Sequence, residues 1–275
     1  MQTFLPYPDF AQSAAALDSP RLGKQRVEVL QILRAITFPS YGWTNHPATR
    51  MWRGYVPALA SYGLAMVDEW VSRGAADSTR AQIAEFAPIV EDVPIDQLSK
   101  PVWLGNPELH RSHQSNLIRK LPEFYRPQFP GVPDDLDYVW PEPDVMPPAE
   151  PLDGSPIWIF RAHDDAQLEG WIEHGEVTIG ELSPSGRIGP KWQRQVESFL
   201  VLPIGTRLAA LGSDTTLRLG TLASDANAHV EDGLNPTEIF FRDVKFHGSL
   251  QRSDFPYPAL LQDPRTLFET VGPLP

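Results

Sequence analysis

A positively charged side chain interrupts the apolar face of a helix predicted over residues 21–34. At about 100° per residue, Arg26 falls in the middle of an apolar stripe on this helix. The stripe consists of Leu22, Val29, Leu33 and Ile36. The adjoining face carries Arg21, Gln25 and Glu28, so a guanidinium, an amide and a carboxylate share one helical edge. Such a set can hold a phosphate and move a proton. The alternative is a buried arginine paired with a carboxylate from another part of the chain.

Two further predicted helices begin with polar residues. One follows Asn45 and His46, has Pro47 in its first turn, and is expected to run to about residue 73 with a kink at Pro57. The other begins after residue 106, and its first turns are crowded with hydrogen-bonding groups. These groups belong to His110, Arg111, Ser112, His113 and Asn116. Donors at the start of a helix favour the binding of anions.

Charge is distributed unevenly along the chain, whose formal net charge is -12. Residues 1–140 contain 13 Lys and Arg against 15 Asp and Glu, whereas residues 141–275 contain 10 against 20. A first half near neutrality can carry a basic cleft for a polyanion, and a solvated surface of mixed charge is the alternative. The residues that could line such a cleft are Arg21, Lys24, Arg26, Arg50, Arg53, Arg111, Arg119, Lys120 and Arg126.

Composition excludes several classes of protein. The chain of 275 residues is 41% hydrophobic, enough for one large domain or two of ordinary size. Without cysteine it has no disulfide, no thiolate zinc site and no cysteine nucleophile, so residues 174–176 are not part of a zinc deaminase site. No common phosphate-binding glycine loop occurs, and we expect no nucleotide cofactor, no other cofactor and no metal. No apolar run is long enough to span a membrane and no secretory signal is evident, so we expect a soluble cytoplasmic protein.

Three segments together resemble the pyrimidine-dimer DNA glycosylase family of the phage endonuclease V type, in a longer bacterial branch. The segments are residues 21–28, residues 42–54, and residues 109–113 with 120–125. The resemblance implies a compact all-α body with DNA across a basic face. It also implies an N-terminal α-amine that attacks the sugar carbon of the damaged nucleotide. An α-amino group titrates near ~8 and a lysine near ~10.4, so more of the α-amine is unprotonated and nucleophilic at neutral pH.

The chain differs from the family pattern at two places. The family's catalytic glutamate directly follows an arginine that would map onto Arg26, but Val27 stands there, and Glu28 comes one residue later. Glu28 takes the role if the helical register differs or the helix is rotated. The family exposes a threonine amine, whereas this chain begins Met1-Gln2, and methionine is normally kept before glutamine. Either the amine of Met1 is the nucleophile, displaced by one residue, or Glu28 activates water without an amine.

A proline-rich stretch at residues 141–156 predicts a stiff linker, and a second domain is expected over residues 157–275. Strands are predicted at residues 157–161, 177–182, 207–211, 217–222, 238–246 and 267–271, with a helix at 166–173. This order predicts a mixed β-barrel with small helices. Its first, central and last segments resemble PUA-like or EVE-type domains, which read modified bases. The alternative is an acidic β-domain for protein contacts or stability.

The sequence thus predicts a multidomain α + β protein. An all-α glycosylase-like domain occupies residues 1–140 and a PUA-like mixed β-barrel follows the linker. We expect the protein to be a DNA glycosylase, with or without AP-lyase activity, that excises a damaged or modified base from DNA. A pyrimidine is the expected base. A non-catalytic reader of modified DNA bases and a protein-interaction scaffold are the alternatives.

Each candidate residue has an expected role. Arg26 would hold a phosphate or the flipped sugar, and Glu28 would be the acid, base or electrostatic group. The candidate catalytic residues are Glu28, Arg26, Met1 and Gln2. The candidate DNA-binding residues are Arg21, Lys24, Gln25, Asn45, His46, Arg50, His110, Arg111, Ser112, His113 and Asn116. The nucleotide would be unstacked into a cleft between the first and the fourth predicted helix.

Overall fold

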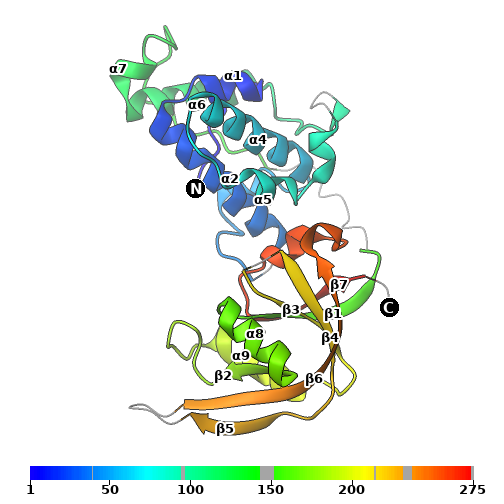
Figure 1. The fold of residues 1–275 in the computed structure, drawn as a ribbon. Helices are drawn as coiled ribbons and strands as arrows, with labels where there is room; N and C mark the ends of the chain where they lie inside the picture. The colour runs from blue at the N-terminus through cyan, green and yellow to red at the C-terminus, as the bar shows by residue number, and fades with distance from the viewer. Residues whose placement is uncertain (39, 94–96, 143–151, 214, 232–236, 274–275) are drawn as a thin grey trace. The chain divides into compact units, whose positions relative to one another are not determined.

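The computed structural model describes residues 1–38, 40–93, 97–142, 152–213, 215–231 and 237–273. The chain divides into two compact units, Met1–Ala149 and Glu150–Pro275 (Figure 1). The border between them falls inside the proline-rich stretch at residues 141–156. Residues 143–151 of that predicted linker lie outside the described part of the chain.

Helices and turns build the described part of the first unit. Its helices are α1 (Phe10–Ala15), α2 (Ser19–Thr37), α3 (Pro47–Arg50), α4 (Val56–Ser72), α5 (Arg80–Ala84), the 3-10 helix η1 (Pro88–Glu91), α6 (Pro107–Lys120) and α7 (Pro122–Tyr125). The prediction of one kinked helix from Pro47 to residue 73 is wrong. Gly54, at φ 83°, lies in the turn between α3 and α4. Pro57 lies in the first turn of α4, where the missing N–H of proline costs nothing.

Two glycines allow α2 to pack closely on its neighbours. A Cβ at Gly63 of α4 would lie 2.7 Å from Cγ1 of Val29 in α2. A Cβ at Gly23 of α2 would lie 2.9 Å from the ring of Trp70. Real Cβ atoms do not approach other atoms this closely, so glycine at these positions brings the α2 and α4 backbones together. The helix that carries Glu28 is fixed in this way against the core.

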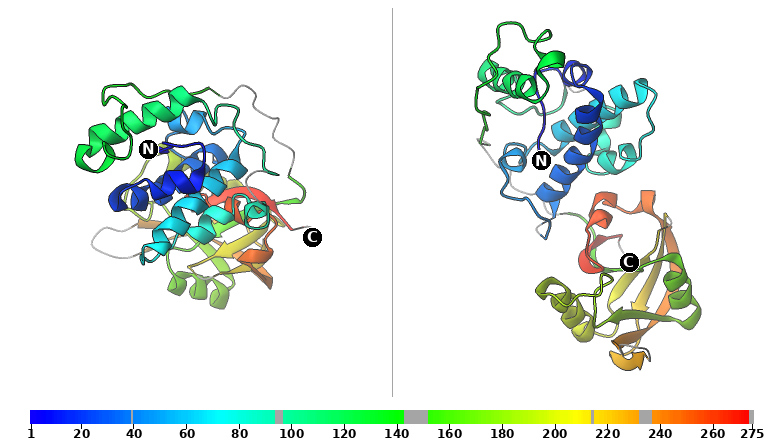
Figure 2. Two further views of the ribbon diagram at one scale, coloured as in Figure 1. Left: turned by 90° about the horizontal axis from the view of Figure 1, so that it is seen from above. Right: turned by 90° about the vertical axis from the view of Figure 1, so that its left-hand side faces the viewer.

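Residues 1–5 run through the helical unit without regular secondary structure, as an extended segment (Figure 2), and residues 6–9 bend into α1. Thr3, Phe4 and Leu5 are buried. The Trp52 indole N–H donates to Oγ1 of Thr3 at 3.0 Å. An extended segment lacks internal backbone hydrogen bonds, so side chains of the helices must supply its partners.

Two histidines of α6 hold the backbone of Leu5. The Leu5 N–H donates to Nδ1 of His113 at 3.1 Å, and Nδ1 of His110 lies 2.8 Å from the Leu5 carbonyl oxygen. The Gly105 N–H donates to Nε2 of His110, so the hydrogen of that ring is on Nδ1 and is donated to Leu5. Burial lowers the pKa of His113 to about 3, with a smaller effect from His110. Both rings are therefore neutral parts of the fold at physiological pH.

A seven-stranded mixed sheet forms the centre of the second unit. Its elements are β1 (Ser155–Arg161), α8 (Asp165–His174), β2 (Glu176–Gly180), α9 (Pro190–Val201), β3 (Arg207–Leu211), β4 (Thr216–Leu222), β5 (Asn227–Glu231), β6 (Thr237–Gln251), η3 (Arg252–Asp254), η4 (Pro258–Gln262) and β7 (Leu267–Gly272). The strand order is β2-β6-β4-β3-β1-β7, and β5 also pairs with β6. Strands β1 and β3 are parallel, and the other pairs are antiparallel. The sheet of the described residues is open and does not close into the predicted barrel, because β2 and β7 remain at its two ends.

Two apolar clusters cover the two faces of this sheet. Trp171 of α8 and Phe199 of α9 pack with strand residues such as Phe160 on one face, around which the sheet curves (Figure 1). Phe255 and Leu261 cover the other face. The sequence prediction did not include α9 or β5. The seven-residue spacing of Trp192 and Phe199, two turns of helix, is the signal that would have indicated α9.

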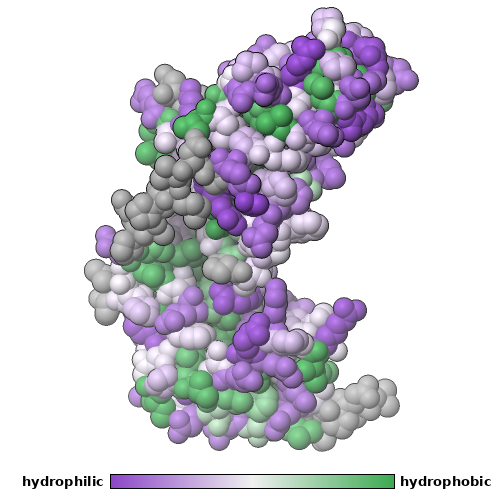
Figure 3. Space-filling view, turned by 180° about the vertical axis from the view of Figure 1, so that it is seen from behind, coloured by the Kyte–Doolittle hydropathy of each residue, from purple (hydrophilic) through white to green (hydrophobic). Residues whose placement is uncertain are grey.

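Hydrophilic and hydrophobic side chains alternate in small patches on the face drawn in Figure 3. No helix among the described residues is long and apolar enough to cross a membrane.

We expect His113 to make the stability of the first unit depend on pH. Below about pH 6.5 the unfolded histidine binds a proton, whereas the folded one stays neutral down to a pKa of about 3, so the stability that His113 confers is lost as the pH falls through this window. His113→Gln keeps an acceptor for the Leu5 N–H and removes the titrating ring. Urea unfolding at several pH values between 7 and 5 should show a shallower slope in this variant, with a difference that grows toward about 1.4 kcal/mol per pH unit at the acid end of this range. The exposed His247→Gln serves as control, and equal slopes in all three proteins would contradict the expectation.

Candidate functional site

A hollow of about 470 Å³ opens in the first unit between the N-terminal segment, α2 and the end of α6. Its lining residues are Met1, Gln2, Phe4, Pro20, Arg21, Lys24, Glu28, Lys120 and Tyr138. This volume is in the range of sites for small organic ligands. The hollow brings together the two ends of the unit, since residues 1–4 and residue 138 meet at it.

An amine and a carboxylate face each other in this hollow. The α-amino nitrogen of Met1 lies 3.6 Å from Oε1 of Glu28, and Nζ of Lys24 lies 3.4 Å from the same oxygen. The Met1 side chain is 2% exposed and the Glu28 side chain 7%. The Thr49 hydroxyl lies 3.8 Å from Sδ of Met1. The side chain of Met1 is thus buried in the first unit, and this burial places its α-amine beside Glu28.

The carboxamide of Gln25 holds both groups in position. Its Nε2 donates to Oε2 of Glu28 at 2.9 Å and to the carbonyl oxygen of Gln2 at 3.0 Å. Its Oε1 accepts the N–H of Phe4 at 2.8 Å and lies 2.7 Å from the hydroxyl of Tyr62. Gln25 itself is fully buried. One side chain therefore connects the backbone next to Met1 with the carboxylate that faces the Met1 amine.

Two tyrosines near the carboxylate remain protonated. Burial raises the pKa of Tyr62 well above its ordinary value, and the charge of Glu28 adds to this effect. Burial also raises the pKa of Tyr138 to about 12, and here too the charge of Glu28 raises it further. Both phenol groups are therefore hydrogen-bond donors at neutral pH. Tyr138 is one of the residues that line the hollow.

His46 lies close enough to the amine and the carboxylate to respond to their charges. Burial lowers the pKa of His46, the Met1 amine lowers it further, and Glu28 raises it. Its Nδ1 accepts the N–H of Ala48 and caps the start of α3. His46 is therefore a neutral N-cap of α3 that lies beside the hollow.

Cations outnumber carboxylates in the lining, since Arg21, Lys24 and Lys120 accompany Glu28. The guanidinium of Arg21 pairs with Asp18 at 2.8 Å and donates to the carbonyl of Lys120. Nζ of Lys120 lies 5.9 Å from the ring centre of Phe4. A hollow with more cations than anions attracts a polyanion.

Residues 1–83 match the family of pyrimidine dimer DNA glycosylases. The matched range contains Met1, Gln25 and Glu28 and ends within α5. The resemblance expected from the sequence is confirmed for this glycosylase-like segment. The similar stretches at residues 109–113 and 120–125 lie beyond it. No curated protein matches the chain at a significant level.

Within the glycosylase-like segment, the structure places Arg26 away from the amine. Its guanidinium pairs with Asp77, lies 4.4 Å from the ring centre of Trp70, and does not line the hollow. The expectation that Arg26 opens into the cleft is wrong, because it and Glu28 lie about 200° apart on α2. The helix presents Glu28, and not the position after Arg26, to the amine. Arg26 is instead a partly buried arginine paired with a carboxylate from another part of the chain.

Several candidate DNA-binding residues are buried. Gln25, His110, Ser112, His113 and Asn116 are at most 6% exposed. Ser112 accepts the Val139 N–H, and Asn116 donates to the carbonyl of Leu136. Direct contact of these five side chains with DNA does not fit their burial. They hold the N-terminal segment and the chain near residues 136–139 against α6 and α2.

Other candidates are exposed but lie outside the lining of the hollow. Asn45 is exposed in the turn before α3. Arg50 pairs with Glu142 at 2.7 Å, and Arg111 donates to the carbonyl of Gly131 at 3.2 Å. The part of the chain that the structure describes contains no group of three or more His, Cys, Asp or Glu that could hold a metal.

Reasoning from the sequence missed Tyr62 and Tyr138. Tyr62 lies on the apolar stripe of α4, a pattern that is typical of a core residue and describes its ring but not its hydroxyl. Tyr138 lies in a proline-rich segment without periodicity, so no local pattern could place it at the hollow.

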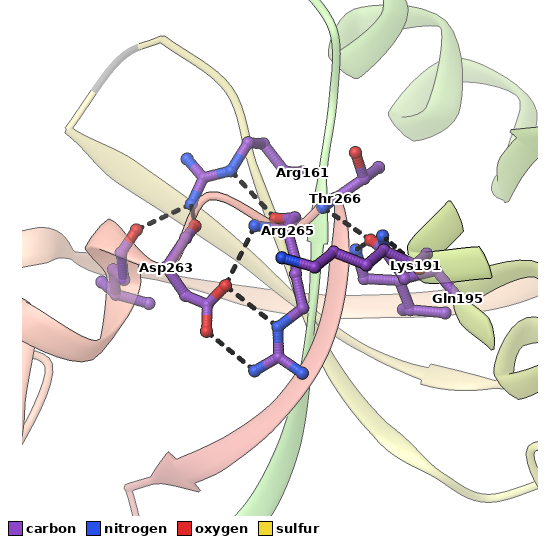
Figure 4. Close-up of polar contacts among 8 residues, drawn as sticks. Arg161, Lys191, Gln195, Asp263, Arg265 and Thr266 are labelled. Atoms are coloured by element: carbon purple, nitrogen blue, oxygen red, sulfur yellow. Dashed lines mark hydrogen bonds and ion pairs between the residues drawn. The ribbon is translucent and has the colours of Figure 1, made fainter. Parts of the chain in front are cut away.

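A second hollow of about 390 Å³ lies in the second unit. Its lining residues are Arg161, Ala162, His163, Gln167, Thr178, Ile179, Gly180, Leu182, Pro184, Trp192, Pro264 and Thr266. Figure 4 shows the Arg161 guanidinium close to Asp263, and it donates to the carbonyl of Leu261 in η4 at 2.7 Å and to that of Asp263, just after η4, at 2.9 Å. The described lining contains no Asp or Glu, although residues 141–275 carry twice as many acidic as basic residues.

Loss of the Gln25 carboxamide should destabilise the first unit. Gln25→Met keeps the length of the side chain and leaves the Phe4 N–H, the Gln2 carbonyl and one oxygen of Glu28 without a partner. We expect the free energy of unfolding to fall by about 3 kcal/mol, since each buried unsatisfied group costs about 1–3 kcal/mol. Urea unfolding measures the change. Gln31→Met, at a partly exposed site of the same helix, should change it by less than about 0.5 kcal/mol. Similar losses in both variants would contradict the role given to Gln25.

Proposed function

We propose that the first unit is a DNA glycosylase that removes a base from damaged DNA, with the Met1 amine and Glu28 as its reacting groups. The observation that carries this proposal is the 3.6 Å approach of the amine to the carboxylate in a hollow lined by three cations. The family match over residues 1–83 supports the glycosylase class and DNA as the substrate. A pyrimidine dimer is the expected lesion, and the cytoplasm is the predicted location.

The proposed reaction begins when the amine nitrogen attacks C1′ of the damaged nucleotide. A bond forms between nitrogen and C1′ as the bond from C1′ to the base breaks, and the base leaves with a proton. The carboxylate of Glu28 accepts a proton from the attacking amine and stabilises the positive charge that develops on the sugar. The amine gives up two protons in this sequence: one leaves with the base, and the other passes through the Glu28 carboxylate to O4′ as the sugar ring opens, which leaves an imine between the protein and C1′. Elimination of the 3′ phosphate from this imine would supply the AP-lyase activity.

Glu28 could also act alone by activating a water molecule, which would release the base without a covalent intermediate. The buried position of Met1 favours the route in which its amine is the nucleophile. A buried methionine side chain and the Gln25 bond to the Gln2 carbonyl fix the amine beside the carboxylate. A nucleophile held in reacting geometry gains much of its rate from this positioning.

We also propose that the second unit helps to select the base. Its hollow is mixed in character, with Trp192 and Ile179 beside the polar Gln167 and Thr178. A lining without Asp or Glu in an acidic unit suits a ligand rich in hydrogen-bond acceptors, such as a nucleobase. This reading agrees with the expected likeness of residues 157–275 to PUA-like or EVE-type domains. If the first unit has no activity, a reader of modified bases is the second candidate function.

Borohydride should trap the protein on DNA if the amine reacts. We expect incubation of the protein with DNA that contains a pyrimidine dimer, in the presence of borohydride, to give a stable protein–DNA adduct. Mass spectrometry of the adduct should locate the modification on the α-nitrogen of Met1. Glu28→Gln keeps the shape and removes the charge, so it should slow base release by ~100-fold or more while DNA binding changes little. The exposed Glu123→Gln is the control.

Three outcomes separate the possibilities. Base release without an adduct would replace the amine route by activated water. Full activity of Glu28→Gln would exclude Glu28 from the chemistry. Absence of both base release and adduct across dimers and modified pyrimidines, with binding retained, would contradict the enzyme and favour the reader.

The second unit is tested in the full chain with His163→Ala. His163 is exposed at the second hollow, so this variant should weaken selection between modified and ordinary DNA about tenfold, since a well-placed base contact is worth ~1–3 kcal/mol. Binding of ordinary DNA should stay as in the original protein. His174→Ala, at an exposed histidine at the end of α8, is the matched control. Equal selection in both variants would contradict a role for the second hollow.

A further inference from the structure

A row of aromatic rings leads from the hollow of the first unit to its surface. The rings of Tyr138 and Trp140 lie 5.3 Å apart, those of Trp140 and His46 lie 6.2 Å apart, and those of His46 and Trp43 lie 5.7 Å apart. Tyr138 lines the hollow that holds Met1 and Glu28. The two halves of the row come from residues 43–46 and residues 138–140, which are far apart along the chain. Only the folded chain forms this row.

Trp43 is the outer end of the row and is 64% exposed. Its φ of 69° is the only positive φ of a non-glycine residue in the described ranges. Large side chains are disfavoured in this conformation, which glycine adopts readily. Two hydrogen bonds hold this turn: within it, the His46 N–H donates to the Trp43 carbonyl at 3.0 Å, and from outside it, Arg53 donates to the Thr44 carbonyl at 2.7 Å. A bulky ring at a strained and exposed position gains nothing from core packing, so strain here indicates a function.

We propose that Trp43 stacks on an unpaired nucleobase of the DNA strand, next to the nucleotide whose sugar meets the Met1 amine. The lining cations Arg21, Lys24 and Lys120 would hold the phosphates of that strand. Cations that hold the phosphates, together with an exposed aromatic ring on which a base stacks, are the combination by which proteins bind single-stranded nucleic acid, because every base offers a π-face. The ring of Trp43 is therefore a positioning group for the strand, and this role rests on the proposed glycosylase function.

Two probes separate stacking from charge. The first is a single-stranded oligothymidylate, and the second is an oligomer of equal length made of abasic tetrahydrofuran units, with the same phosphates and no bases. Trp43→Gly removes the ring and suits the positive φ, so the turn is retained. We expect this variant to bind oligothymidylate about tenfold more weakly, within the range typical of base–aromatic stacking. Binding of the abasic oligomer and the salt dependence of binding should not change, since no phosphate contact is lost.

Two further variants make the test specific. Trp43→Phe keeps a smaller ring and should recover part of the lost affinity. Phe124→Ala removes an exposed aromatic of α7 that is outside the row, and it should bind both oligomers like the original protein. Equal binding of oligothymidylate by Trp43→Gly and the original protein would overturn the proposal. An equal loss on both oligomers would also overturn it, because the effect would then not come from the bases.

Failure of the stacking proposal is distinguishable from failure of the glycosylase proposal. Borohydride trapping on dimer-containing DNA by the original protein tests the enzyme alone. If the stacking role holds, Trp43→Gly should need about tenfold more DNA than the original protein to reach half-maximal trapping, within the range typical of base–aromatic stacking. A protein that traps DNA but shows no dependence on Trp43 would keep the glycosylase proposal and reject the stacking role.

Discussion

The carboxamide of Gln25 joins three parts of the helical unit. It is fully buried in α2, where it binds the backbone of Gln2 and Phe4 on one side and the carboxylate of Glu28 on the other. A buried amide has two donor hydrogens and an acceptor oxygen that need partners, and in Gln25 the N-terminal segment, Glu28 and Tyr62 provide them. The path of the N-terminal segment and the orientation of Glu28 are thus fixed by the same group. The approach of the Met1 amine to Glu28 follows from this arrangement.

The environment of Glu28 is polar because a buried carboxylate needs partners. An amide, the amine of Met1 and the ammonium of Lys24 surround its two oxygens. The neighbouring tyrosine, Tyr62, remains a neutral donor under the influence of the same charge. Burial costs a charged group much of its hydration, and these contacts replace it. The site can therefore keep a negative charge next to an amine while it remains open to a ligand through the hollow.

Much of the fold was predictable from local patterns. The stripe of apolar residues indicated α2, although the helix begins two residues earlier with Pro20 in its first turn, and the polar residues after Asn106 indicated the start of α6. The break between α3 and α4 was missed because Pro57 fits the start of a helix as well as a kink. The open sheet was predicted as a barrel because strand order and closure depend on which edges pair, and alternation along each strand says nothing about that.

The sequence by itself determined the resemblance of residues 1–83 to pyrimidine dimer DNA glycosylases and the presence of Gln25 and Glu28 on one edge of α2. Residues three positions apart lie on the same side of any α-helix, so the proximity of Gln25 and Glu28 does not depend on how the helix packs. Only the tertiary structure decided which charged residue of α2 faces the amine. Arg26 contacts Trp70 of α4 and pairs with Asp77 in the segment after α4, whereas Glu28 lies next to the amine of Met1. Such contacts join residues far apart along the chain, and packing of the helices decides them.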